Sequence, residues 1–204
     1  MTPSPRFPLF RAIFVAVAAL SLASCGLNSI PTAEENAKAK WADVQAQYQR
    51  RADLVPNLVA TVQAAAKQEQ GTLVKITEAR AKATSVTLSA DDLKDPAKVK
   101  AYQDAQSQLS VALRGFTSIA EAYPDLKTNE NYVTLMSQLE GTENRITVSL
   151  RDYNDSVRAY NTRIRTFPDM IGAKIIYGSK PMTPFEAAAG AEKAPEVGKI
   201  FNGS

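Results

Sequence analysis

An apolar side chain recurs at every seventh position over much of this 204-residue chain, and that period restricts the folds open to it. Two turns of an α-helix take about seven residues, so such positions form a stripe along one face of a helix. The pattern predicts long helices that bury these stripes against one another. The run without a gap comprises Tyr132, Leu139, Ile146, Tyr153, Tyr160 and Phe167.

Two earlier stretches show the same period with some interruptions. The first contains Arg51, Glu69 and Thr72 on its stripe and Pro56 near its middle. A proline inside a helix removes a hydrogen bond and usually kinks the helix. We therefore expect the first helix either to bend near Asp53 or to consist of two helices in sequence. The apolar stripe positions are Trp41, Tyr48, Val55, Val62, Ile76 and Ala83 in the first stretch, and Tyr102, Leu109, Phe116 and Tyr123 in the second.

Prolines mark the helix boundaries. Asp95 followed by Pro96 is typical of a helix start, with the aspartate as N-cap and the proline in the first turn. The second helix should end before Pro124 and the third before Pro168, because the residue ahead of a proline disfavours the helical conformation. Strand-like alternation is not evident. The predicted fold class is all-α, a long antiparallel up-down-up helical bundle.

The first 24 residues are typical of an export signal. Two arginines precede an apolar run at 12–20, which is shorter than the about 20 residues that a membrane-spanning helix needs. The run leads to Leu22, Ala23, Ser24 and Cys25, a sequence that resembles a bacterial lipobox. That resemblance implies a lipid on Cys25, although an ordinary cleaved signal or an uncleaved anchor would also contain such residues.

The domain organisation follows from these signals. We expect a lipoprotein signal peptide at 1–24, a lipidated tether at 25–33, the helical bundle at 34–186 and a disordered, small and polar tail at 187–204. The expected location is a bacterial membrane, with the lipid on Cys25 as anchor and the bundle facing the periplasm or the cell exterior.

The composition excludes several classes of function. The chain has no histidine and one cysteine, which excludes catalytic sites based on histidine, histidine-containing zinc sites and internal disulfides. A net charge of +3 gives no support for nucleic-acid binding. No glycine-rich phosphate-binding loop is present. We expect no cofactor, no metal site and no enzymatic activity.

Several polar motifs occur in a fixed order and together resemble the LemA family. They are QRRADLVPNL at 49–58, EAYPDLK at 121–127, LEGTENRI at 139–146, YNDSV at 153–157, YN at 160–161 and FP at 167–168. The resemblance covers about residues 41–185. It implies a bacterial envelope protein with long antiparallel helices behind an N-terminal membrane anchor, and it implies little about mechanism.

Helix lengths predict where two of these motifs lie. If three helices run up, down and up with a rise of about 1.5 Å per residue, the 49–58 motif lies beside the 121–127 turn. The expected polar cluster either locks the helices or docks a partner. For Arg51, which falls on the apolar stripe, the expected partners are Glu69, Asp125 or Glu143. The cluster comprises Arg50, Arg51, Asp53, Asn57, Asp125 and Lys127.

Two carboxylates, Glu140 and Glu143, lie three residues apart and so share a helix face. We interpret them as solvated or salt-bridged side chains rather than a metal site or an acid/base pair. The predicted function is a non-catalytic helical scaffold or binding protein of the cell envelope, with an envelope protein as partner. The alternatives are a homo-oligomeric bundle on the membrane surface and a hydrolase that uses carboxylates alone.

Overall fold

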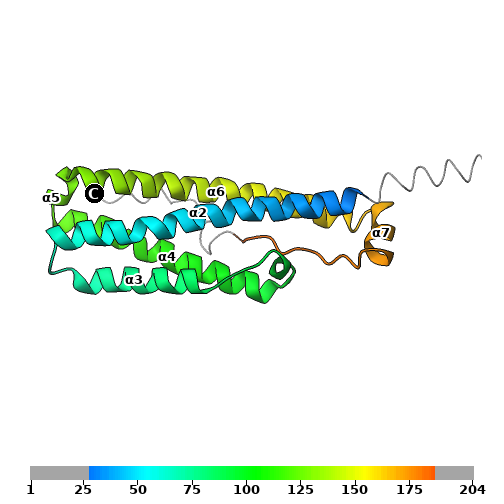
Figure 1. Cartoon of the computed structure of the whole chain (residues 1–204), viewed down its shortest axis with the longest axis horizontal. Helices are drawn as coiled ribbons and strands as arrows, with labels where there is room; N and C mark the ends of the chain where they lie inside the picture. The colour runs from blue at the N-terminus through cyan, green and yellow to red at the C-terminus, as the bar shows by residue number, and fades with distance from the viewer. Residues whose placement is uncertain (1–27, 187–204) are drawn as a thin grey trace, which may run out of the picture.

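Four long helices run antiparallel along one axis in the computed structural model, which describes residues 28–186 (Figure 1). They are α2 (Ser29–Ala65), α3 (Gln70–Ser85), α4 (Pro96–Ala122) and α6 (Glu130–Arg163). Three short helices join or extend them: η1 (Asp91–Lys94), α5 (Asp125–Thr128) and α7 (Asp169–Ile175). Residues 28–186 contain no strand, so the all-α prediction is confirmed.

The helices form two antiparallel pairs. α2 packs along α6, and the shorter α3 packs along α4. Because α2 and α6 are the longest helices, their pair extends beyond the other at the end that carries α7, whereas α5 closes the opposite end (Figure 1). At the α7 end, the connection from α3 to α4, which includes η1, contributes Leu88 and Leu93 to the core, and the segment after α7 contributes Met182 and Phe185.

The stretch predicted as the first helix forms two helices, α2 and α3. The bundle therefore has four long helices instead of the three that were predicted. α2 continues through Pro56 and ends at Ala65, after which the chain reverses at 66–69. The proline is tolerated because its missing N–H frees the backbone carbonyl of Ala52, and Arg80 Nε of α3 donates to that oxygen at 2.7 Å. Glu69 interrupts the stripe because it is the N-cap residue of α3.

The predicted helix starts agree with the structure. The Asp95 side chain accepts hydrogen bonds from the backbone N–H groups of Ala97 and Lys98, at 2.9 and 3.4 Å. Asn129 caps α6 in the same way by accepting from Tyr132 N at 3.0 Å. Both caps satisfy donors that the first helical turn leaves without a partner.

The apolar stripes are buried with two exceptions, Tyr123 and Phe167. Tyr123 is only partly buried at the C-terminal end of α4. Phe167 was placed on the stripe of the third helix, but it is 77% exposed, because α6 ends at Arg163 and the chain then turns. The expected tether at 25–33 also differs, since α2 begins at Ser29 and buries Ile30. Cys25, the signal peptide and the tail at 187–204 lie outside the described residues.

Among the described helices, none combines the length and the hydropathy that crossing a bilayer requires.

Candidate functional site

The most unusual side chain in the bundle is that of Arg51, a charged group in the core that is only 1% exposed. It enters from α2 at a stripe position, so the helix period directs it between the other helices. Its Nη1 donates to Ser110 Oγ at 2.6 Å and to Glu143 Oε1 at 3.1 Å. Its Nη2 donates to the backbone oxygen of Gln106 at 3.2 Å and to that residue's Oε1 at 2.5 Å.

These contacts join all four long helices in one layer. Arg51 links α2 to α4 and α6, and Gln106 Nε2 of α4 donates to the backbone oxygen of Ala83 on α3 at 3.2 Å. The buried Nε of Arg51 has no hydrogen-bond partner among the described residues. A buried guanidinium is tolerated when its charge is paired and most of its donors have partners, as Nη1 and Nη2 do here. Because those partners sit at fixed heights on three helices, the layer sets how the helices align along the axis.

This layer separates the core into two parts with different composition. On the α7 side, the aromatic core contains Trp41, Val44, Tyr48, Leu93, Val99, Tyr102, Ile146, Tyr153, Val157, Tyr160, Met182 and Phe185 among its buried residues. On the α5 side, the aliphatic core contains Leu54, Val55, Leu58, Val62, Leu73, Ile76, Leu109, Leu113, Phe116, Leu126, Tyr132 and Leu139.

Tyrosines border the arginine on the aromatic side. The guanidinium carbon of Arg51 lies 4.9 Å from the ring centroid of Tyr48, which is the geometry of a cation–π contact. Burial raises the pKa of Tyr48 above its ordinary value, although the positive charge of Arg51 opposes this. Burial likewise raises the pKa of Tyr102 to about 12, against the effect of Arg51 and a hydrogen bond with Gln106. Both phenols are therefore neutral at physiological pH.

The structure does not bring the six residues of the expected polar cluster together. Arg51 lies level with Ser110 on α4, and α4 continues for 12 more residues, or about 18 Å, before the turn that carries Asp125. Asp125 and Lys127 lie in α5 at the far end of the bundle. The expected placement was wrong because it assumed one unbroken first helix. Of the three expected partners of Arg51, only Glu143 is hydrogen-bonded to it in the part of the chain that the structure describes.

Three members of the expected cluster do share a surface. Arg50, Asp53 and Asn57 line an open groove along α2, together with Gln138 of α6. All three are exposed, and Asp53 Oδ1 accepts a hydrogen bond from Gln49 at 2.8 Å. The 49–58 motif thus has two sides, because its inward residues build the core and the Arg51 layer whereas its outward residues form a polar groove.

The two carboxylates at 140 and 143 have different surroundings. Glu143 is bound to Arg51, whereas Glu140 is exposed and raises the pKa of Tyr132 through its charge, in addition to the larger effect of burial. An acid/base pair needs both carboxylates free to face the same substrate. Here one of them is occupied by the buried guanidinium, as expected for a salt-bridged side chain.

A second polar arrangement was missed by the sequence analysis. Residues 180–186, which we call the strap, run back along α6 in extended conformation and cover the aromatic core (Figure 1). Asn161 forms two hydrogen bonds with the backbone of Met182, at 2.8 and 2.9 Å. Asn154 forms the same two with Phe185, at 2.9 and 2.8 Å.

Tyrosines next to these asparagines hold the strap as well. Tyr160 Oη donates to the backbone oxygen of Lys180 at 3.1 Å, and Tyr153 Oη donates to that of Thr183 at 3.0 Å. Each tyrosine and the asparagine next to it form a pair, and the two pairs are seven residues apart on α6. The strap residues that they bind are three residues apart. Seven helical residues rise about 10.5 Å, and three residues of an extended chain span about 10 Å. This near match explains the tyrosine–asparagine repeat, which was the available signal in the sequence.

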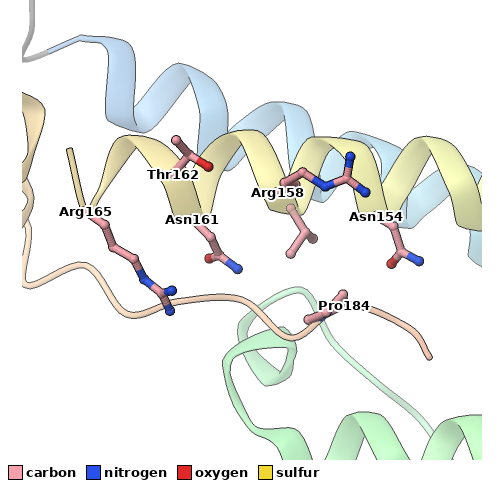
Figure 2. A pocket seen from close by; sticks show the side chains of 7 residues that line it. Asn154, Arg158, Asn161, Thr162, Arg165 and Pro184 are labelled. Atoms are coloured by element: carbon pink, nitrogen blue, oxygen red, sulfur yellow. The ribbon is translucent and has the colours of Figure 1, made fainter.

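The strap also forms one wall of a surface groove. Figure 2 shows Asn154, Arg158 and Asn161 of α6, and Arg165 just beyond its C-terminal end, near Pro184 of the strap. Arg158 is paired with Asp155 at 3.4 Å, and the asparagine amides are engaged by the strap. The groove is open, and Thr162 contributes a hydroxyl to its lining alongside the two arginines.

The comparison with known families agrees with this architecture. A family model described as LemA family matches residues 40–198. The chain belongs to the LemA family. It is also 27% identical over 125 residues to the protein LemA of Metamycoplasma hominis, an alignment that covers 61% of this chain and 52% of that protein. The chain thus spans about half the length of the curated relative it matches.

The structure shows what the polar motifs that resemble the LemA family do in the fold. In this LemA-family chain, the motifs at 49–58 and 139–146 meet through Arg51 and Glu143, and the motifs at 153–157 and 160–161 hold the strap. The motif at 121–127 contributes α5, whose Leu126 is buried in the aliphatic core. Most of the motifs therefore take part in the architecture of the bundle.

Proposed function

We propose that this protein is a membrane-anchored, non-catalytic scaffold or binding protein of the bacterial cell envelope. Membership of the LemA family supports an envelope role without catalysis. The observation that carries the proposal is the use of the polar motifs. Arg51, Glu143, Asn154 and Asn161, the groups best suited to chemistry, are bound to one another or to backbone inside the fold.

A scaffold needs a rigid body and an accessible surface. The layer around Arg51 and the tyrosine–asparagine contacts give the body a fixed alignment. The groove lined by Arg50, Asp53 and Asn57 offers both charges and an amide along an exposed face of α2. Such a surface suits a polar protein partner, because complementary charges fix register and raise association rates.

A photo-crosslinking amino acid at position 57 tests the proposal in living cells. Asn57 is exposed in the groove, whereas Val111 on α4 is 64% exposed outside it and serves as the matched control. We expect position 57 to capture a second protein and position 111 not to. Crosslinks that contain only multiples of this chain would favour the homo-oligomer, and equal yields at both positions would contradict the binding groove.

Membrane attachment is tested separately through the cysteine. Cys25 is the only cysteine in the chain, and a lipid on its sulfur is the proposed anchor. We expect Cys25→Ser to leave the protein soluble outside the cytoplasm or as an uncleaved precursor. Normal cleavage together with unchanged membrane fractionation would contradict the lipid anchor.

A further inference from the structure

The α7 end of the bundle exposes large apolar side chains in a continuous stretch. Elsewhere in residues 28–186, the exposed large hydrophobic residues are the valines at 74, 111, 133 and 148, each on a different part of the helices. Contiguous apolar surface of this kind is uncommon on a protein that faces only water. The apolar end patch consists of Phe167, Met170, Ile171, Ile175, Ile176 and Tyr177.

The orientation of α7 is the reverse of what burial alone would produce. Its buried residues are Gly172 and Ala173, whereas Ile171 is 50% exposed and Ile175 is 79% exposed. A surface helix normally turns its large apolar side chains toward the core. α7 instead packs its small residues on the bundle and directs its large ones outward, so this outward face is suited to an apolar environment.

Basic residues surround the patch. Arg163, Arg165, Lys174 and Lys180 are all exposed, and no carboxylate of residues 28–186 lies within ion-pair distance of any of them. The one acidic residue between positions 163 and 180, Asp169, accepts a hydrogen bond from Ser29 Oγ at 2.7 Å. This end is therefore locally positive, and positive charge around an apolar patch suits an anionic lipid surface.

The hydrogen bond between Ser29 and Asp169 also shows that the described chain starts beside α7. Ser29 begins α2, so the 27 residues that precede the described region, with the apolar run at 12–20 and Cys25, join the bundle beside α7. Any membrane attachment through that segment brings this end of the bundle nearest to the bilayer. The patch, its basic rim and the attachment of the N-terminal segment thus point to one surface.

We propose that the α7 end of the bundle docks on the surface of an anionic lipid bilayer. The apolar end patch enters the interface, and the four basic residues face lipid phosphates. The docked bundle stands away from the membrane, because α2 extends from this end for 37 residues, or about 55 Å. This inference deepens the proposed membrane anchoring by adding a contact that the protein's own surface makes.

Coupling through the single cysteine allows a test that does not depend on natural lipidation. The full chain is attached through Cys25 to a maleimide headgroup lipid in anionic vesicles that contain brominated acyl chains. Ile175→Trp places a fluorophore in the patch, and the native Trp41, which is 1% exposed, gives the background. Val111→Trp is the matched control at an exposed valine far from α7.

We expect Ile175→Trp to be quenched at least about twofold more than the wild type, because interfacial side chains lie about 5–10 Å into the headgroup and acyl boundary. Val111→Trp should match the wild type. Adding Lys174→Gln and Lys180→Gln should reduce the quenching of Ile175→Trp on anionic vesicles. Quenching of Ile175→Trp no greater than that of Val111→Trp would overturn the proposal.

The outcome separates this inference from the proposed lipid anchor. Failure of natural lipidation appears in the fractionation of Cys25→Ser and leaves the quenching result intact. Failure of docking appears as equal quenching on vesicles to which the chain is chemically attached. Since position 175 is 79% exposed, the tryptophan variant should fold as the wild type does, and its melting curve checks this.

Discussion

The two halves of the core are enclosed in different ways. The aliphatic core is enclosed by four helices, and most of its buried side chains are leucine, isoleucine, valine and alanine, with Phe116 and Tyr132 as its buried aromatic residues. The aromatic core lies where α3 has ended, so the strap takes the place of the missing helical wall. An extended segment cannot satisfy its own backbone, and α6 supplies tyrosine and asparagine partners for it. Directional hydrogen bonds therefore replace helix packing in one half.

The largest effect should come from the centre of the aromatic core. Trp41 packs against Tyr102, Tyr153 and Phe185 with ring centroids 5.4 to 5.6 Å apart, and its indole N–H donates to the backbone oxygen of Leu88. Trp41→Ala should cost about 3–5 kcal/mol of unfolding free energy. Chemical denaturation measures this, and an effect below that of the surface change Val111→Ala would show that the aromatic half contributes little.

Loosening the strap should cost less and act locally. Asn154→Ala removes both hydrogen bonds to Phe185 and should destabilise the fold by about 1–3 kcal/mol. Amide hydrogen exchange should speed up at Phe185, while the amides of the aliphatic half stay protected. Asn144→Ala, at an exposed position of α6, is the matched control. If protection fell equally in both halves, the strap would not be a local element of the aromatic half.

Alkaline pH should weaken the aromatic half through its tyrosines. Burial raises the pKa of Tyr48 and Tyr153 above the ordinary value and that of Tyr102 to about 12. The unfolded phenols lose their protons near pH 10 and the folded ones do not, so this stabilisation is complete below pH 10 and is lost as the pH rises through the folded pKa. Each tyrosine contributes a slope of up to about 1.4 kcal/mol per pH unit.

Denaturation of Tyr102→Phe at several pH values isolates one of these contributions. The variant lacks the phenol, so its unfolding free energy should fall less steeply above pH 10 than that of the wild type. Parallel curves for the two proteins would contradict a raised pKa at this position.

The smallest expected effect probes helix packing in the aliphatic half. A Cβ at Gly115 would lie 2.8 Å from Thr72 Cγ2 of α3, so Gly115→Ala should destabilise by about 1 kcal/mol despite the better helix propensity of alanine. At Gly141 the nearest atom is Nη1 of Arg145 at 3.5 Å, and alanine there should stabilise by up to about 1 kcal/mol. Thermal melts that shift in the same direction would contradict the close approach of α3 and α4.

Sequence periodicity predicted the core well, because residues such as Leu109, Leu139 and Ile146 are buried by helix–helix contact alone. It did not predict the number of helices. Pro56 looked like a break, but Arg80 satisfies the carbonyl that the proline leaves free, and that contact spans 28 residues. The chain actually reverses at 66–69, a segment without proline. Glu69 in this segment interrupts the apolar stripe, but a single interruption does not distinguish a turn from a continuous helix.

The candidate site was predicted in part, because local periodicity identified Arg51 but the helix count that places distant motifs was wrong. A buried partner for Arg51 follows from a charge on an apolar stripe, and Glu143 was among the residues considered. The position of Asp125 depended on the helix count and was therefore wrong. The strap residues themselves show no period. Their signal was the tyrosine–asparagine repeat on α6, and that repeat does not reveal that Tyr153 and Asn154 bind backbone atoms about 30 residues away.

The central claim is that the Arg51 layer locks the two halves in register. A double-mutant cycle between Arg51→Ala and Glu143→Ala, measured by chemical denaturation, tests it most directly. The account predicts a coupling of at least about 1 kcal/mol between these two positions, whereas the cycle of Arg51→Ala with Asp125→Ala should be additive within about 0.5 kcal/mol. Additive effects of Arg51 and Glu143, or a larger coupling between Arg51 and Asp125, would contradict the layer as the element that aligns the bundle.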